Sequence, residues 1–333
     1  MSNELQPDRP SHLPGRPPTP TELAGIPSLV GKMRATVRSF WAEAPGYQRL
    51  AYLVGVGLLL IGLAHAAIWA VTGGSASGPL SWRKPTTFAT SFGLTTLTLG
   101  WIGSYLPVSR RIGWIAAGLL CAATIYEVAW VVIQHARGVP AHFNDTTALD
   151  ERLFVLGAVM VVIAIGVIAV MTLAAVVRTS APAPMALAIR AGLVGLLAAQ
   201  VTGLWMLLHG LALLDADADP LSQSMSTVGA AGSMKFAHAV PMHAIQVLAA
   251  LAWLLWRSPL PQRRQLQLVA VAAVGYAGLF GVALLRTTSG LAPIKLLDAS
   301  TVGYLIAAAF LAAPAVATVT ARSRRAPGRI GAG

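Results

Sequence analysis

Apolar residues follow one another along this chain in blocks of about 20, separated by short polar segments. A block of that length forms an α-helix that crosses the hydrocarbon core of a bilayer. The predicted fold class is therefore all-α, a polytopic bundle of transmembrane helices. We expect about eight spans, at 50–71, 86–106, 112–134, 153–177, 191–213, 236–256, 266–285 and 299–320.

The segments before and after these blocks have a different composition. Residues 1–27 are rich in proline and polar residues and predict a disordered tail. Residues 28–43 mix apolar and basic side chains at helical spacing, which predicts an amphipathic helix in the membrane interface. Residues 321–333 form a basic tail. The first long apolar block begins near residue 50, too late and too long for a secretory signal peptide.

Composition and charge agree with a membrane protein. The chain is 56% apolar and 11% charged, with a mean hydropathy of +0.67, whereas soluble chains are about half apolar and a quarter charged. The net charge is +12, but the cations lie in short segments between apolar blocks. This pattern is typical of topology signals and anionic lipid head groups rather than of a nucleic-acid surface. We therefore expect the lipid bilayer, and not nucleic acid, as a partner.

The distribution of cations also predicts the orientation. With the N-terminus in the cytoplasm, the inner segments hold most of the arginines and the outer segments take most of the acids. We therefore expect both termini, including the two tails, on the cytoplasmic side. Cys121 is the only cysteine, which excludes an intramolecular disulfide and any multi-cysteine metal or iron–sulfur site.

On this topology six of the seven histidines fall in the outer half of the membrane or at its outer surface. They are His65, His135, His142, His209, His238 and His243. Histidine is the commonest metal ligand in proteins, and ionisable groups inside a membrane mark functional sites. We predict that His65, His238 and His243 bind a metal or cofactor, because they lie within apolar helix. The other three occupy interfacial positions, where an imidazole needs no special role.

The spacing of two of these histidines limits the metal hypothesis. His238 and His243 are five residues apart, which is about 140° around a helix. A regular helix would not direct both side chains at one metal, although Pro241 between them favours a break in that regularity.

Glu127 is the only acid well inside a predicted span. Trp130 and Gln134 follow it at i+3 and i+7 and share its helix face. A lone carboxylate in hydrocarbon pairs with a cation, stays protonated or faces a wet cavity. The alternative is a hydrogen bond to a neighbouring helix. Glu127 and His243 are the candidate catalytic residues for proton transfer.

Arg83 and Lys84 stand just before the helix that begins at Pro85, on the side where the positive-inside rule disfavours cations. Free N–H groups and two cations suit an anion or a cofactor carboxylate. The alternative is that both side chains extend to the lipid head groups. Further members of the predicted polar site are His142, Asn144 and Gln246, the last on the same face as His243.

Short motifs in three parts of the chain resemble a bacterial family of multi-pass membrane proteins with no established activity. They are Trp82-Arg83-Lys84-Pro85, then Arg137-Gly138 followed by His142-Phe143-Asn144, and Lys235-Phe236-Ala237-His238 with His243-Ala244-Ile245-Gln246. The resemblance covers about residues 50–285 and implies a location in the inner membrane. It implies no activity, cofactor or catalytic residue.

Three functions stay open. The first is a redox-type membrane protein that binds haem or a transition metal through its histidines, with Arg83, Lys84, Lys235 or Arg286 pairing the haem propionates. The second is a membrane enzyme acting on a lipid-linked or exoplasmic anionic substrate, with Glu127 or His243 as general base. The third is a transporter of a small anion or a proton-coupled solute. The one-sided polar residues favour the first two, and the number of histidines favours the first. A purely structural role would leave the histidines unexplained.

Overall fold

The structure is a computed structural model that describes residues 31, 38, 41–78, 80–216, 223–295 and 299–323. The predicted tail 1–27, most of the predicted interfacial helix 28–43 and most of the basic tail 321–333 lie outside the described residues. Residues from Gly46 onward form one compact unit. All contacts given below are within this unit.

The described part of this unit is almost entirely helical, which confirms the all-α prediction. Its helices are α3 (Gly46–Thr72), α4 (Arg83–Ile102), α5 (Arg110–Ala136), α6 (Ala148–Val177), α7 (Ala183–Asp215), α8 (Met234–Met242), α9 (Ala244–Trp256), α10 (Gln262–Thr288) and α11 (Ala299–Ser323). Two short 3-10 helices, Gly103–Tyr105 and Gln223–Ser226, and the strands β1 (Thr227–Val228) and β2 (Gly232–Ser233) complete the described elements. The strands pair antiparallel, with Thr227 opposite Ser233 and Val228 opposite Gly232.

Seven helical segments in the described residues are long and apolar enough to cross a membrane, with α8 and α9 taken together. This supports a multi-pass membrane protein in contact with the lipid bilayer. Helix α4 is not among them because its 20 residues are rich in threonine and glycine. Most helices also extend beyond the predicted spans. For example, α7 begins at Ala183 instead of residue 191.

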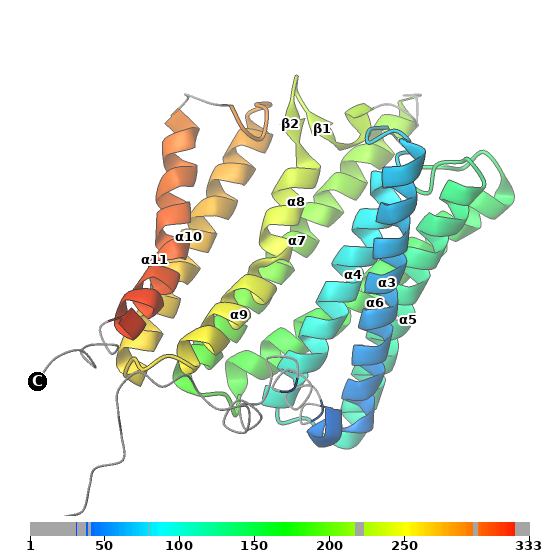
Figure 1. The fold of residues 1–333 in the computed structure, drawn as a ribbon. Coiled ribbons are helices and arrows are strands. Elements are labelled where there is room, and N and C mark those ends of the chain that lie inside the picture. The colour runs from blue at the N-terminus through cyan, green and yellow to red at the C-terminus, as the bar shows by residue number, and fades with distance from the viewer. Residues whose placement is uncertain are drawn as a thin grey trace, which may run out of the picture. The chain divides into compact units, whose positions relative to one another are not determined.

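The helices alternate in direction along the chain (Figure 1). We call the end of the bundle where α3 ends and α4 begins the histidine end. We call the end where α5 begins and α6 ends the arginine end, after Arg110, Arg111 and Arg178. The histidine end is at the top of Figure 1, and the arginine end is at the bottom.

The largest apolar core lies toward the arginine end, where α4, α6, α7, α9 and α10 pack together. This core includes Leu99 and Ile102 of α4, Ile189 and Leu193 of α7 and Ile245 of α9, and all five side chains are fully buried. Toward the histidine end the packing of α4 and α5 includes more polar and aromatic side chains, such as Phe88, Glu127 and Trp130. The fold thus puts the polar residues of both helices in its less apolar half.

The predicted sixth span is interrupted. Helix α8 ends at Met242, and His243 has φ −90° and ψ 3° before α9 begins at Ala244. Pro241 accounts for the break, because proline supplies no backbone N–H and its ring collides with the preceding turn. His238 and His243 therefore belong to different parts of a bent segment.

Candidate functional site

Aromatic rings from three segments meet at the histidine end. Trp130 of α5 lies 4.6 Å from the ring of His142, measured between ring centroids, and Phe88 of α4 lies 5.4 Å from the same imidazole. Trp130 is 3% exposed and Glu127, one helical turn earlier, is 2% exposed. We call Lys84, Phe88, Glu127, Trp130 and His142 the Trp130 cluster.

The loop 137–147 folds inward and carries His142 into this cluster. Phe143 takes a positive φ of 58°, and its ring packs so closely on Gly210 of α7 that a Cβ there would lie 2.4 Å from it. Asn144 holds the loop from within, since its amide donates to the Pro140 carbonyl at 3.0 Å and its oxygen accepts from the Thr146 hydroxyl at 2.6 Å. Asn144 thus acts on the shape of the loop, since its hydrogen bonds join it to Pro140 and Thr146 of the same loop.

Several buried polar atoms of this region have no hydrogen-bond partner in the part of the chain that the structure describes. They are Glu127 Oε1, Trp130 Nε1, His142 Nδ1 and, before α4, Ser81 Oγ. Buried polar atoms in proteins almost always have partners, and a buried carboxylate oxygen left alone is costly. A donor, an acceptor and a carboxylate close together therefore mark a place for a polar ligand or water.

Two lysines add positive charge to the cluster. Lys84 is half-buried in the first turn of α4, and its charge interacts with that of Lys235, which is exposed at the start of α8. Neither lysine forms an ion pair with a described carboxylate, since the one ion pair among the described residues joins Arg137 to Asp150. Arg83 is exposed and its Nε donates to the Ala76 carbonyl at 3.1 Å, which holds its guanidinium over the α3–α4 loop.

His142 is neutral in this environment. Burial lowers the pKa of His142 well below its usual value of 6.5, and the positive charges of Lys84 and Lys235 lower it further. A neutral imidazole retains one nitrogen that accepts a proton or a hydrogen bond. The cluster thus combines cations with an uncharged base.

The folded protein should lose stability as the pH falls below about 6.5, because the unfolded chain then binds a proton at His142 that the folded chain does not. One such group changes the free energy of unfolding by up to about 1.4 kcal/mol per pH unit. This dependence stops once the pH falls below the lowered pKa of His142 in the folded state. Thermal unfolding of the detergent-purified protein between pH 5 and pH 8 measures the slope. The variant His142→Gln should show a smaller slope, and an unchanged slope in that variant would contradict the account.

Gln134 lies on the same helix face as Glu127 and Trp130, as predicted, but its hydrogen bonds join α5 to α6 and do not reach the Trp130 cluster. It is fully buried and donates to Asp150 Oδ1 at 2.8 Å, while its own oxygen accepts from Arg137. Asp150 also pairs with Arg137 at 2.5 Å and accepts from the Thr147 hydroxyl at 2.6 Å. This network ties the end of α5 to the start of α6 and sets the two ends of the loop that carries His142.

Replacing Asp150 with alanine should lower the melting temperature by about 5 °C, because Gln134 and Arg137 lose their shared acceptor. Asp145→Ala is the matched control, since Asp145 is an exposed carboxylate in the loop 137–147 that this network anchors. The measurement is thermal unfolding of both variants in the same detergent. Equal melting temperatures for the two would show that the network does not hold the loop.

The structure does not bring the predicted histidine ligands together. His65 is half-buried near the end of α3, where its Nδ1 is 2.9 Å from the Ile61 carbonyl of its own helix. His238 packs on α7, and His243 lies half-buried at the bend between α8 and α9. Among the described residues no group of three His, Cys, Asp or Glu side chains is arranged to hold a metal. His65, His238 and His243 thus form no three-ligand group in the described residues, and the binding of a metal or cofactor by any of them stays a prediction.

Other predicted residues serve contacts between helices. The side-chain amide of Gln246 on α9 lies 3.2 Å from the Thr95 hydroxyl of α4. When the amide nitrogen faces the Met242 carbonyl, the Thr95 hydroxyl donates to the Gln246 oxygen. His135 of α5 packs on Trp82, with ring centroids 4.6 Å apart. Neither contact involves the Trp130 cluster directly. Lys235, by contrast, belongs to the electrostatic surroundings of the Trp130 cluster, since its charge acts on His142.

The chain matches no protein-family model, no curated protein sequence and no solved structure. The side chains and their arrangement are thus the basis for any functional assignment.

Proposed function

We propose that this protein spans a bacterial cell membrane eight times, with both termini in the cytoplasm, and binds an anionic phosphate-type group from the outer side. In this proposal α4 also crosses the membrane and, together with the seven more apolar segments, makes eight spans. It alternates in direction with its neighbours, and its hydroxyl groups are internally satisfied, since Thr90, Thr96 and Thr98 donate to carbonyls one turn earlier. Such bonds let threonine reside in hydrocarbon.

The main support is that buried polar atoms without a partner among the described residues lie beside Lys84 and Lys235, neither of which pairs with a described carboxylate. A phosphate-type group carries negative charge and several acceptor oxygens, which suit the ammonium groups of Lys84 and Lys235 and the indole N–H of Trp130. The backbone of α4 adds little to this set, because the Lys84 N–H donates to the Ser81 carbonyl at 3.0 Å and Pro85 has no N–H. Each of these donors belongs to a different element, so their combination depends on the fold.

Glu127 and His142 extend the proposal from binding to chemistry. Both have a buried atom without a partner, and both lie against Trp130 in space or along the helix. A carboxyl group in an apolar setting and a neutral imidazole are suited to proton transfer near neutral pH. This favours a membrane enzyme that acts on a lipid-linked or exoplasmic anionic substrate, and Glu127 is the proposed general base.

Calorimetric titration of the detergent-purified full chain tests this function. Inorganic phosphate represents a soluble anion and lysophosphatidic acid represents a lipid-linked one. We expect saturable binding of at least one probe, with the tighter probe identifying the source of the natural ligand. Glu127→Gln should keep most of the binding, because it retains shape and hydrogen bonding. Absence of binding for both probes would contradict the proposal.

Haem or metal binding is the second candidate, and one observation favours it. His238 Nδ1 donates to the Ala199 carbonyl at 2.7 Å, which fixes the proton on Nδ1 and leaves Nε2 with a free lone pair. Histidine ligands of metals are commonly oriented in this way. Lys84 and Arg83 would pair the propionates of a haem. Absorption spectra of oxidised and reduced protein, expressed with ample haem, should then show a Soret band that His238→Ala abolishes, and a colourless well-folded protein would rule out haem.

A further inference from the structure

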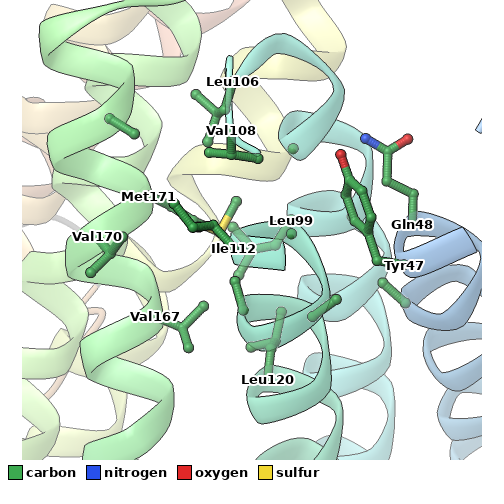
Figure 2. A pocket seen from close by; sticks show the side chains of 17 residues that line it. Tyr47, Gln48, Leu99, Leu106, Val108, Ile112, Leu120, Val167, Val170 and Met171 are labelled. Carbon is green, nitrogen blue, oxygen red and sulfur yellow. The ribbon is translucent and has the colours of Figure 1, made fainter. Parts of the chain in front are cut away.

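A second, apolar site lies toward the arginine end, away from the Trp130 cluster. It is a cavity of about 60 Å³ between α3, α4, α5 and α6 (Figure 2). Val167, Val170 and Met171 of α6 lie on one side of it, and Tyr47 and Gln48 of α3 lie on the other. Its lining is almost wholly apolar, and so it suits a hydrocarbon group.

Small residues create this cavity. Gly100 of α4 and Gly113, Ala116 and Ala117 of α5 line it where larger side chains would fill the space. Gly113 lets α5 approach α3, since a Cβ there would lie 2.7 Å from the Tyr47 ring. The close approach is thus local, and the alanines one turn further along α5 leave the adjoining volume open.

The cavity opens toward the lipid-facing surface of the bundle. Ile112 and Val170 line it and are also 48% and 56% exposed. Exposed apolar side chains on helices of membrane-spanning length face hydrocarbon, so what enters between them is a lipid chain rather than water.

The end of the cavity near the membrane surface is polar and positively charged. The hydroxyl of Tyr47 and the amide of Gln48 lie toward the same end as Leu106 and Val108 (Figure 2). Arg110 and Arg111 directly precede the lining residue Ile112 on α5. Arg178 follows the lining residue Ala174 by one helical turn, and all three arginines are exposed.

Within the compact unit that begins at Gly46, no described carboxylate lies at this end of the bundle. From Gly46 onward, the described carboxylates all lie in the half of the bundle nearer to the histidine end. They are Glu127, Asp145, Asp150, Glu151 and Asp215. Exposed arginines without neighbouring carboxylates attract anionic lipid head groups.

We propose that the cavity binds a segment of one acyl chain of an anionic phospholipid, whose head group lies against Arg110, Arg111 and Arg178. The small residues of α4 and α5 supply the space for the chain, and the arginines select the head group. This site is separate from the Trp130 cluster and does not depend on the function proposed for it.

Native mass spectrometry of the full chain tests the lipid site. The delipidated protein is incubated with vesicles of phosphatidylglycerol or of phosphatidylcholine, and the lipid retained per chain is counted. The wild type should retain one phosphatidylglycerol. Ala116→Phe fills the cavity and should reduce retention about fivefold, whereas Ala122→Phe, on the exposed face of the same helix, should retain lipid as the wild type does.

Two results would overturn the proposal. One is equal retention by Ala116→Phe and the wild type. The other is equal retention of phosphatidylcholine and phosphatidylglycerol by the wild type. The milder Ala117→Leu takes the place of Ala116→Phe if the larger side chain prevents folding.

The double variant Arg110→Gln and Arg111→Gln should lower phosphatidylglycerol retention to the phosphatidylcholine level, and undiminished retention would contradict the role of the arginines.

Discussion

Replacing Lys84 and Lys235 together by glutamine should weaken the binding of inorganic phosphate by about 100-fold. Each lysine supplies a positive charge beside His142, and no described carboxylate pairs with either. A single substitution should have a smaller effect, larger for the half-buried Lys84 than for the exposed Lys235, because water screens the exposed charge. Calorimetric titration of phosphate at low ionic strength measures all three variants.

Lys295→Gln is the matched control for the double variant. Lys295 is an exposed lysine in the loop between α10 and α11 at the same end of the bundle. Its removal changes the net charge by the same unit per residue, so it accounts for any general attraction of phosphate to a cationic surface. If Lys295→Gln weakens binding as much as Lys84→Gln, the phosphate is attracted by net charge and the Trp130 cluster is not its site.

The variant Gly55→Leu should destabilise the protein by about 3 kcal/mol or prevent its folding. Helices α3 and α4 touch backbone to backbone at this point. A Cβ at Gly55 would lie 2.9 Å from the Gly93 carbonyl oxygen, and a Cβ at Gly93 would lie 2.8 Å from the Gly55 carbonyl oxygen. The backbone of a neighbouring helix has no way to yield as a flexible side chain does. Small residues at such crossings drive helix association within membranes.

Gly57→Leu provides the control on the same helix. A Cβ at Gly57 would meet no atom within 4 Å, so leucine there should be tolerated. Thermal unfolding and the yield of monodisperse protein in detergent distinguish the two variants. Similar behaviour of Gly55→Leu and Gly57→Leu would mean that α3 and α4 are not packed as described.

The helices were predictable because their lengths follow directly from apolar composition. A run of Leu, Val, Ile and Ala of bilayer length has few other stable arrangements, and the all-α fold follows. The start of α7 was harder to predict from the sequence. Helix α7 begins at Ala183 instead of residue 191, because Pro184 suits a first helical turn and Met185, Ala188 and Ile189 are buried in the apolar core. The bend at His243 was indicated by Pro241.

The cluster was predictable only in part. Glu127 and Trp130 share a buried face, as their spacing indicates, because helix geometry fixes which residues lie together along one element. Spacing gives no information on contacts between elements. The inward loop that brings His142 against Trp130 depends on Phe143 packing on Gly210 of α7, a contact between residues far apart in the sequence.

The predicted metal ligands show the same limit. His65, His238 and His243 were grouped because all three lie within apolar helix on one side of the membrane. Sharing a depth in the membrane does not place side chains on facing helices, and in the described residues they form no metal-binding group. For Lys235 the sequence predicted only a cation at this end of the bundle, whereas the fold brings its charge close enough to act on His142.

A structure of the full chain with bound tungstate, an electron-dense substitute for phosphate, tests whether the Trp130 cluster binds an anion. We expect one strong peak within hydrogen-bond distance of Trp130 Nε1 and of the Lys84 ammonium group, with His142 and Glu127 beside it. A peak at the exposed arginines of the opposite end alone, or no peak at the Trp130 cluster under conditions where tungstate binding is saturated, would contradict the proposed site.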